Sequence, residues 1–394
     1  MRSESHALET DAVHAGREDL TDLGVHALPI DLSTTNPLPD IETGGHSYES
    51  MATGGTLPSD GSPVYARLWN PTVARFEAAL ATLEKAEEAV AFSSGMAGVS
   101  AALLAMCTGQ NKPHVVAVRP LYGGTDHLLS TGMLGTETTY CTVAEVAATI
   151  REDTGLVILE TPANPTLELV SISGVVEQAG EVPVLVDNTF ATPVLQNPLD
   201  HGAAMSLHSA TKYIGGHGDA VGGVIACRAE TATQLRQVRA VTGGILHPMG
   251  AYLLHRGLAT LPLRVHRAQE TAQQVADWLS QQEAIDQVFY PGSDNDPAPE
   301  DQVGVLNGQM RGPGAMIAVR MTGGYAAAEQ LTSGVTLFTH AVSLGGVDSL
   351  IQHPAALTHR PVAPEARPGA DVVRLSIGLE APEDLIADLS RALS

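Results

Sequence analysis

Short apolar runs alternate with turn residues and helix-like segments between about residues 90 and 230. The runs are HVVAV from His114, GLVILE from Gly155, VPVLVDN from Val182 and AMSLHSATK from Ala204. Continuous apolar runs of about four to eight residues are typical of strands buried on both faces of a parallel sheet. We therefore predict βα repetition and a largely parallel sheet in this region.

A helix is predicted to begin at Pro71, before the first of these strands. Asn70 is a suitable N-cap, and proline fits the first helical turn. Apolar residues then recur at helical spacing: Val73, Phe76, Leu80 and Leu83.

The segments on either side of this α/β region have different patterns. Residues 1–69 are rich in Gly, Pro, Ser and Thr, and we expect an irregular arm that is mobile or laid over another surface. After about residue 261 come a helical pattern, the strand-like AMIAVRM and DVVRLSIGL, and a closing amphipathic helix. The sequence thus predicts an arm (1–69), a large domain (70–260) and a smaller α+β C-terminal domain (261–394).

Composition restricts the possible partners and the location. The 394 residues include 44 Asp and Glu against 21 Lys and Arg, a formal charge of -23. Binding to nucleic acid or to an anionic membrane needs clustered cations, so neither is expected. The N-terminus has no apolar signal core, and no apolar run approaches the roughly 20 residues of a membrane helix. We therefore expect a cytoplasmic protein.

Three cysteines, Cys107, Cys141 and Cys227, are far apart in the chain. Disulfide frameworks and zinc sites both need paired spacing. We expect three buried thiols, no disulfide and no metal site.

Candidate chemistry lies where the predicted strands end, because ligands of open α/β sheets gather at the carboxyl ends of strands. Lys212, one of only three lysines, stands beside the hydroxyls of Ser209 and Thr211 and before a glycine-rich turn. Asp187 directly follows the apolar VLV run. A carboxylate in such a place needs a cationic or protonated partner.

Two further segments complete the set. In FSSGMAG the amides of Gly95 and Met96 stand at a predicted helix N-terminus, which is suited to a phosphate. Tyr122 follows the strand ending near Val118 and could present an aromatic face. Taken singly, these features are more often an ordinary helix start, a turn residue, a solvated cation and a core or rim aromatic residue.

Together they meet the needs of one cofactor, pyridoxal 5'-phosphate. Its aldehyde requires a lysine, its ring nitrogen an acid, its phosphate amides and hydroxyls, and its ring an aromatic plate. No G-x-G-x-x-G opens a helix after a strand and no Walker A loop is present, which disfavours dinucleotides and nucleoside triphosphates.

The chain also resembles the cystathionine gamma-synthase, cystathionine gamma-lyase and methionine gamma-lyase family of pyridoxal-phosphate enzymes over nearly its whole length. The matching motifs are YARLWNPTVARFE, AFSSGMAG, LYGGT, ETPANPT, VDNTFATP, HSATKYIGGHGD, HAVSLGGVDSLIQHPAALTH and VRLSIGLE. The resemblance implies an α/β, aspartate-aminotransferase-like (fold type I) enzyme of sulfur amino-acid metabolism. Its large sheet would be mixed but mostly parallel.

The resemblance also implies roles for individual residues around the cofactor. Lys212 would form the covalent link, Asp187 would pair with the ring nitrogen, and Tyr122 would stack on the ring. The phosphate would be held by four residues, namely Gly95, Met96, Ser209 and Thr211.

Further roles concern a neighbouring subunit and the substrate. Tyr65 and Arg67 match the pair that reaches the phosphate of a neighbouring subunit, which implies a homotetramer of two tight dimers. Arg374 matches the arginine that grips the substrate α-carboxylate. Ser343 and Asn164 would assist it.

The implied reaction is elimination of a γ-substituent from an L-amino acid, giving a 2-oxo acid and ammonia. Lys212 would move protons and Tyr122 would protonate the leaving group. γ-Replacement, and β-elimination from a cysteine conjugate, share this machinery and stay open. Retention of the complete set of site residues disfavours a non-catalytic sensor.

Four residues, at three places in the chain, depart from the patterns of better-known members. Gly124 stands where methionine gamma-lyases typically have cysteine, and Arg239-Ala240 stands where they have Lys-Asp. Val342 replaces the glutamate of cystathionine-handling members, which removes a contact for the distal amine of cystathionine. We expect Gly124 to enlarge the substrate pocket.

Overall fold

The computed structural model describes residues 6–293 and 300–394. A seven-stranded sheet with the order β1-β7-β6-β5-β4-β2-β3 forms its centre. The five strands from β6 to β3 pair in parallel, whereas β7 is antiparallel to both β6 and β1. The strands are β1 (Glu88–Phe92), β2 (His114–Val118), β3 (Glu137–Cys141), β4 (Thr154–Glu160), β5 (Val184–Asp187), β6 (Met205–His208) and β7 (Gly223–Cys227).

This sheet confirms the predicted βα repetition, and all four apolar runs are strands. Every residue of β2 and β4 is buried, as expected for strands covered on both faces. The helices between and beside the strands are α3 (Pro71–Glu84), α4 (Gly95–Met106), α5 (Gly123–Thr131), α6 (Val146–Thr149), α7 (Ile172–Ala179), α8 (Thr192–Leu195), α9 (Ala229–Thr242) and α10 (Pro248–Leu258).

The predicted start of α3 is confirmed in detail. The side chain of Asn70 accepts hydrogen bonds from the amides of Thr72 and Val73, and Pro71 is the first helical residue. The Asn cap provides a hydrogen-bond acceptor for amides of the first helical turn, which have no partner within the helix. Proline fits the first helical position because it has no N–H that would need a partner.

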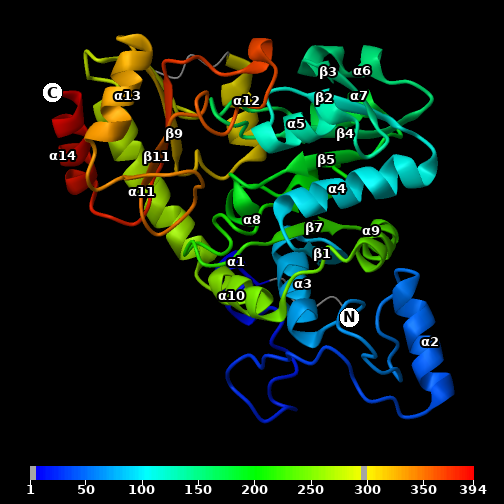
Figure 1. The fold of residues 1–394 in the computed structure, drawn as a ribbon. Coiled ribbons are helices and arrows are strands. Elements are labelled where there is room, and N and C mark those ends of the chain that lie inside the picture. Colours follow the sequence, from blue (N-terminus) through cyan, green and yellow to red (C-terminus); the bar gives the residue numbers. More distant parts are fainter. Residues whose placement is uncertain (1–5, 294–299) are drawn as a thin grey trace.

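A second sheet is built by the last third of the chain. Its order is β10-β11-β12-β9-β8, and Figure 1 shows it beside α11, α13 and α14. The strands are β8 (Ile285–Phe289), β9 (Met316–Met321), β10 (Thr339–His340), β11 (Leu350–Gln352) and β12 (Val372–Ser376). The helices are α11 (Leu261–Leu279), α12 (Glu300–Gln309), α13 (Gly324–Gly334) and α14 (Pro382–Leu393).

The N-terminal arm is less irregular than expected. It contains α1 (Leu8–His14) and α2 (Ile41–Ala52), and α2 falls on the Gly- and Ser-containing stretch IETGGHSYESMA. The expectation of no regular structure was wrong there because Asp40 caps the helix, accepting from the amide of Thr43 at 2.7 Å. In Figure 1 α2 stands at the opposite end of the molecule from α14.

All three cysteines are buried and unpaired, as expected. Across the part of the chain that the structure describes, no helix combines the length and the apolar character needed to cross a membrane.

Candidate active site

A cavity of about 300 Å³ opens where β4, β5 and β6 end. Every predicted site residue lines it except Tyr65 and Arg67. The first sheet contributes residues that end its strands or follow them, and the second sheet contributes Arg374 from β12. Parallel strands bring their carboxyl ends to one edge of a sheet, so residues far apart in sequence converge here.

One end of the cavity has the character of an anion site. Ser94 caps α4 by accepting from the amide of Ala97, while the amides of Gly95 and Met96 have no partner among the described residues. Ser209 packs closely against Gly95, since a Cβ added there would lie 3.0 Å from the Ser209 Cβ. Free amides at the start of a 12-residue helix favour a phosphate group.

Lys212 reaches the centre of the cavity. Its Nζ donates to the hydroxyl of Ser343 at 2.8 Å. Burial lowers the pKa of the Lys212 amine to about 8, and the positive charge of Arg374 acts in the same direction. A lysine that readily becomes neutral is able to act as a nucleophile and a base.

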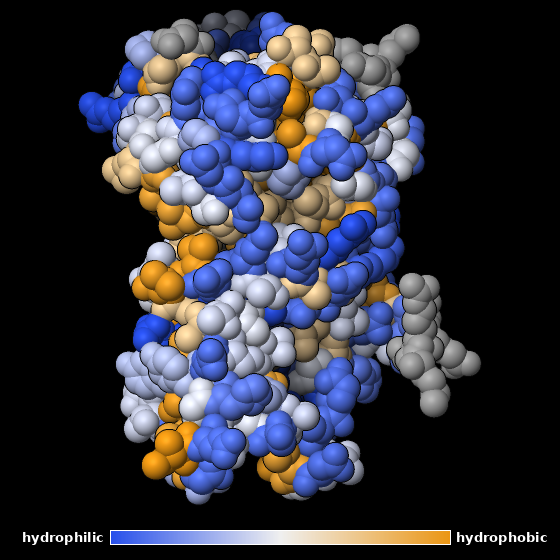
Figure 2. Space-filling view, turned by 90° about the vertical axis from the view of Figure 1, so that its right-hand side faces the viewer, coloured by the Kyte–Doolittle hydropathy of each residue, from blue (hydrophilic) through white to orange (hydrophobic). Residues whose placement is uncertain are grey.

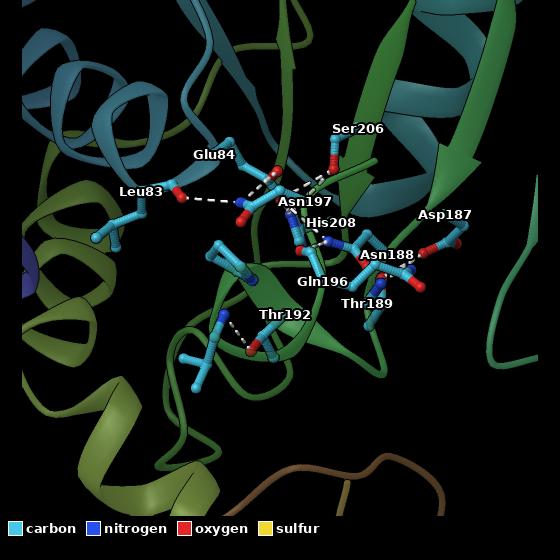
Figure 3. Close-up of polar contacts among 12 residues, drawn as sticks. Leu83, Glu84, Asp187, Asn188, Thr189, Thr192, Gln196, Asn197, Ser206 and His208 are labelled. Atoms are coloured by element: carbon cyan, nitrogen blue, oxygen red, sulfur yellow. Dashed lines mark hydrogen bonds and ion pairs between the residues drawn. The ribbon is translucent and has the colours of Figure 1, made fainter. Parts of the chain in front are cut away.

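Asp187 ends β5 and is held by Thr189. The Asp187 Oδ1 atom accepts from the Thr189 amide at 3.1 Å and from its hydroxyl at 2.5 Å, as Figure 3 shows. Thr189 Oγ1 in turn accepts from the amide of Ser209 at 2.9 Å. Burial raises the pKa of Asp187, and the bonds from Thr189 and the nearby His208 oppose the rise. A buried carboxyl of this kind is suited to a positively charged ring N–H.

Arg374 is buried, with 3% of its surface exposed. It donates to Asn164 Oδ1 at 2.8 Å and to the carbonyl of Ser343 at 2.9 Å, and its Nε has no partner among the described residues. Its guanidinium also lies 5.9 Å from the ring centre of Phe190. No carboxylate contacts it within the described chain, so it is placed to receive one from outside.

The backbone at Ser343 is held in an uncommon conformation. Its φ is +104° although it is not glycine. Such outliers cluster at functional sites, where surrounding structure maintains them. Here the conformation lets one residue offer its hydroxyl to Lys212 and its carbonyl to Arg374.

Tyr122 precedes α5 and lines the cavity. A Cβ added at Gly124 would lie 2.5 Å from the Tyr122 ring, and Gly124 itself does not line the cavity. Glycine at 124 therefore gives room to the tyrosine ring. The expectation that it enlarges the pocket was wrong, because the ring takes that space.

Tyr65 and Arg67 do not reach the cavity of their own chain. Arg67 donates to the carbonyl of Ala240 and lies 5.5 Å from the Tyr65 ring, which is 41% exposed. Arg239 is buried against Glu77 and the carbonyl of Ala91, so in this chain it has a packing role.

Several cavity residues escaped the sequence analysis as individual site residues. Glu160 ends β4 just as Asp187 ends β5, and the same signal, a carboxylate closing an apolar run, identifies both. Thr189 has no such signal, since its role depends on contacts with Asp187 and Ser209. The other unpredicted lining residues include Ser94, Val99, Thr125, Phe190, Leu207, Leu344 and Thr358.

These groups fit pyridoxal 5'-phosphate. The cavity offers free amides at a helix start, a poised lysine, a buried acid two residues before a threonine that holds it, and an aromatic residue. The fold and the cavity together define a fold type I pyridoxal-phosphate enzyme.

Comparison with known proteins agrees. Residues 9–394 match the family model described as Cys/Met metabolism PLP-dependent enzyme, and the chain belongs to this family. It is 60% identical over 385 residues to an L-methionine gamma-lyase of Brevibacterium aurantiacum, covering 98% of this chain and 94% of that one. It is therefore a pyridoxal-phosphate-dependent lyase of the γ-elimination type.

Solved structures show the same fold. The crystal structure of metB from Corynebacterium glutamicum superposes with a TM-score of 0.89 at 37% identity, covering 99% of this chain and 98% of the other. A cystathione gamma lyase (CalE6) from Micromonospora echinospora gives 0.87 at 38% identity, covering 98% and 99%.

Proposed function

We propose that this enzyme eliminates methanethiol from L-methionine, giving 2-oxobutyrate and ammonia. The observation that carries the proposal is the relative named L-methionine gamma-lyase, which shares 60% of its residues with this chain across nearly the full length of both. The cavity lining supports it, because it includes the apolar side chains of Val342, Leu344 and Phe190. Apolar lining residues suit an uncharged thioether.

The residues of this chain divide the work of binding. Arg374 would bind the substrate carboxylate through a bidentate contact of its guanidinium, which Asn164 and Ser343 hold in place. Asp187 would accept the hydrogen of the cofactor ring nitrogen, and Tyr122 would cover the ring. The phosphate would be held by four residues, Gly95, Met96, Ser209 and Thr211.

The same residues move the protons. When bound, pyridoxal 5'-phosphate supplies an electron sink for charge that develops on the substrate carbons. Lys212 would accept the protons that leave the substrate Cα and Cβ atoms, because burial lowers the pKa of its amine to about 8 and so makes the neutral amine accessible. Tyr122 gives the hydroxyl proton to the departing sulfur.

Val342 should make the enzyme favour L-methionine over cystathionine. It is 56% exposed at the cavity edge and offers no charge to the distal ammonium group of cystathionine. We therefore expect cystathionine to react more slowly than L-methionine.

The arm completes the proposal. We propose that residues 1–69 cover a neighbouring subunit of a homotetramer, so that Tyr65 and Arg67 reach that subunit's phosphate site. Large apolar side chains are exposed along the arm, and Figure 2 shows apolar groups at the lower end of the molecule, where Figure 1 places the arm. They include Leu23, Val25, Ile30, Leu32, Leu38 and Ile41.

Residues 70–260 would then hold the cofactor, and residues 261–394 would form the C-terminal domain. The three unpaired thiols agree with a cytoplasmic location.

The decisive experiment measures 2-oxobutyrate and methanethiol released from L-methionine by the holoenzyme. Lys212→Ala should lower the rate by about 10³-fold or more, and Lys112→Ala, an exposed lysine, should not. Borohydride reduction followed by peptide mapping should place the cofactor on Lys212. Faster turnover of cystathionine, or of an O-acylhomoserine with a thiol, would contradict the substrate assignment.

A mixing experiment tests the arm. Arg67→Ala and Lys212→Ala proteins damage different parts of the site, so hybrid oligomers would contain some intact sites if the arm serves a neighbour. Co-refolding of the two inactive variants should restore activity. A fully active monomer by light scattering would contradict the assembly.

A further inference from the structure

Glu160 places a second carboxyl beside Asp187. The two residues are register partners on the parallel strands β4 and β5, so their side chains leave the sheet on the same face about 5 Å apart at the backbone. Both line the cavity, and Glu160 is only 4% exposed.

The carboxyl of Glu160 is poorly compensated for a buried charge. Its Oε2 accepts from the backbone amide of Tyr122 at 2.5 Å, and among the described residues no basic side chain lies within 4.0 Å. Burial and the charge of Asp187 raise its pKa, and the Tyr122 amide, Arg374 and the Asn164 amide oppose the rise. A carboxyl kept in such a place at a cost in stability points to a function.

We propose that Glu160 is a positioning residue of the elimination: it fixes the backbone of Tyr122 over the cavity and, through its negative charge, keeps the phenol of Tyr122 available as a proton donor. This rests on the proposed function, in which Tyr122 protonates the departing sulfur. In that step the C–S electron pair leaves with the sulfur and the phenol O–H bond breaks. Methanethiol forms, and the phenolate regains a proton from water.

The charges around Tyr122 support this assignment. Burial raises the pKa of the phenol most, the carboxyl of Glu160 comes next, Asp187 adds a smaller rise, and Arg374 opposes it. Glu160 is the one of these whose side chain also bonds the backbone of Tyr122. The other charged or titratable groups in the region around Tyr122 are Lys212, His359, Asp126 and Arg119.

Glu160→Gln tests the charge while keeping an oxygen for the Tyr122 amide. Without the negative charge the phenol ionises more easily, so the alkaline fall in kcat for L-methionine should move to lower pH by about 0.5 to 1 unit. A residue that only packs would lower the rate without moving this limb.

Two controls isolate the effect. Glu168→Gln removes the same charge from an exposed residue eight positions on, and it should leave the pH profile unchanged. In a Tyr122→Phe background the phenol is absent, so Glu160→Gln should then cause no further shift. An unmoved alkaline limb in Glu160→Gln, or an equal shift in the Tyr122→Phe background, would overturn the proposal.

Stability of the cofactor-free protein gives a second readout that does not depend on turnover. Because the pKa of Glu160 is raised above 4.5 on folding, its ionisation destabilises the folded state as pH rises through that range. Glu160→Gln should therefore raise Tm by about 2 °C at pH 8 and leave it unchanged at pH 4. A variant that unfolds or fails to fold would contradict the inference.

The two proposals fail differently. If the wild-type enzyme releases no 2-oxobutyrate from L-methionine, the substrate assignment is wrong, and the Tm comparison still decides whether Glu160 carries an uncompensated charge. If the wild type is active and Glu160→Gln keeps its alkaline limb, only the role of Glu160 is wrong.

Discussion

Two buried glutamates, Glu84 and Glu160, lie on opposite faces of the first sheet and have very different surroundings. Leu207 of β6 lines the cavity with Glu160, whereas its neighbours Ser206 and His208 point to the other face and bond Glu84. Alternate residues of a strand face opposite ways, so one short strand separates the two environments.

Glu84 has its charge fully accommodated. At the end of α3 it is 0% exposed and accepts from four side chains, as Figure 3 shows. The distances are 2.9 Å from Ser206, 3.1 Å from Asn188, 2.5 Å from His208 and 3.4 Å from Asn197.

Glu160, in contrast, faces a cavity and interacts with the backbone amides of Tyr122 and Asn164, with no side-chain donor among the described residues. Glu84 and Glu160 are therefore both buried carboxyl groups, but their surroundings suit them to different roles. A carboxylate surrounded by donors holds structure together, and one left short of donors is available to act on its neighbours.

The largest effect should come from removing the charge of Glu84. In Glu84→Gln one carboxylate oxygen becomes an amide NH2 group, a donor that faces other donors such as the Asn197 amide, so folding should be destabilised by about 3 kcal/mol. Urea unfolding measures this. The kcat per folded molecule should be retained, and equal or higher stability would erase the contrast with Glu160.

The cavity side should respond through substrate binding. Arg374→Lys replaces a two-armed contact with a single point charge, so KM for L-methionine should rise about 10- to 100-fold. Arg311→Lys is the matched control, because Arg311 donates to Asn197 and to backbone carbonyls on the Glu84 side. A comparable rise in KM there would show that the two faces are not independent.

A smaller effect is expected for the threonine that holds Asp187. Thr189→Val removes one of two hydrogen bonds to Oδ1, which should weaken cofactor binding about 3- to 10-fold. Titration of the cofactor-free protein with pyridoxal 5'-phosphate measures this. Thr189→Ser, which keeps the hydroxyl, should bind nearly as the wild type does.

The smallest effect concerns the pH dependence of Lys212. Its pKa falls from 10.5 to about 8 on folding. Below pH 8 the amine is therefore charged in both states, and burying that charge lowers the free energy of unfolding. Lys212→Met should stabilise the cofactor-free protein by less than about 1 kcal/mol at pH 7, discounted for partial exposure. The gain should disappear as pH rises toward 10.5, and a gain that grows with pH would contradict this.

Much of the fold follows from local sequence signals. The four apolar runs became strands, and the Asn70–Pro71 start became a capped helix. Helix α2 was missed because two adjacent glycines hide it, while its cap at Asp40 carries a clear signal.

The site could be predicted only in part, for a physical reason. Lys212, Asp187 and Arg374 have chemical types that demand partners when buried, so sequence alone marks them. The space taken by the Tyr122 ring above Gly124, and the positive φ of Ser343, exist only once distant segments pack.

The direct pairing of β4 with β5 has a consequence for how this enzyme would tolerate heat. Main-chain hydrogen bonds of the central sheet set the spacing of residues 160 and 187. Loop motions that increase on warming should therefore not change the distance between the two carboxyl groups until the sheet itself unfolds. The pH of the alkaline fall in activity should then change with temperature only as much as the pKa of an isolated tyrosine does.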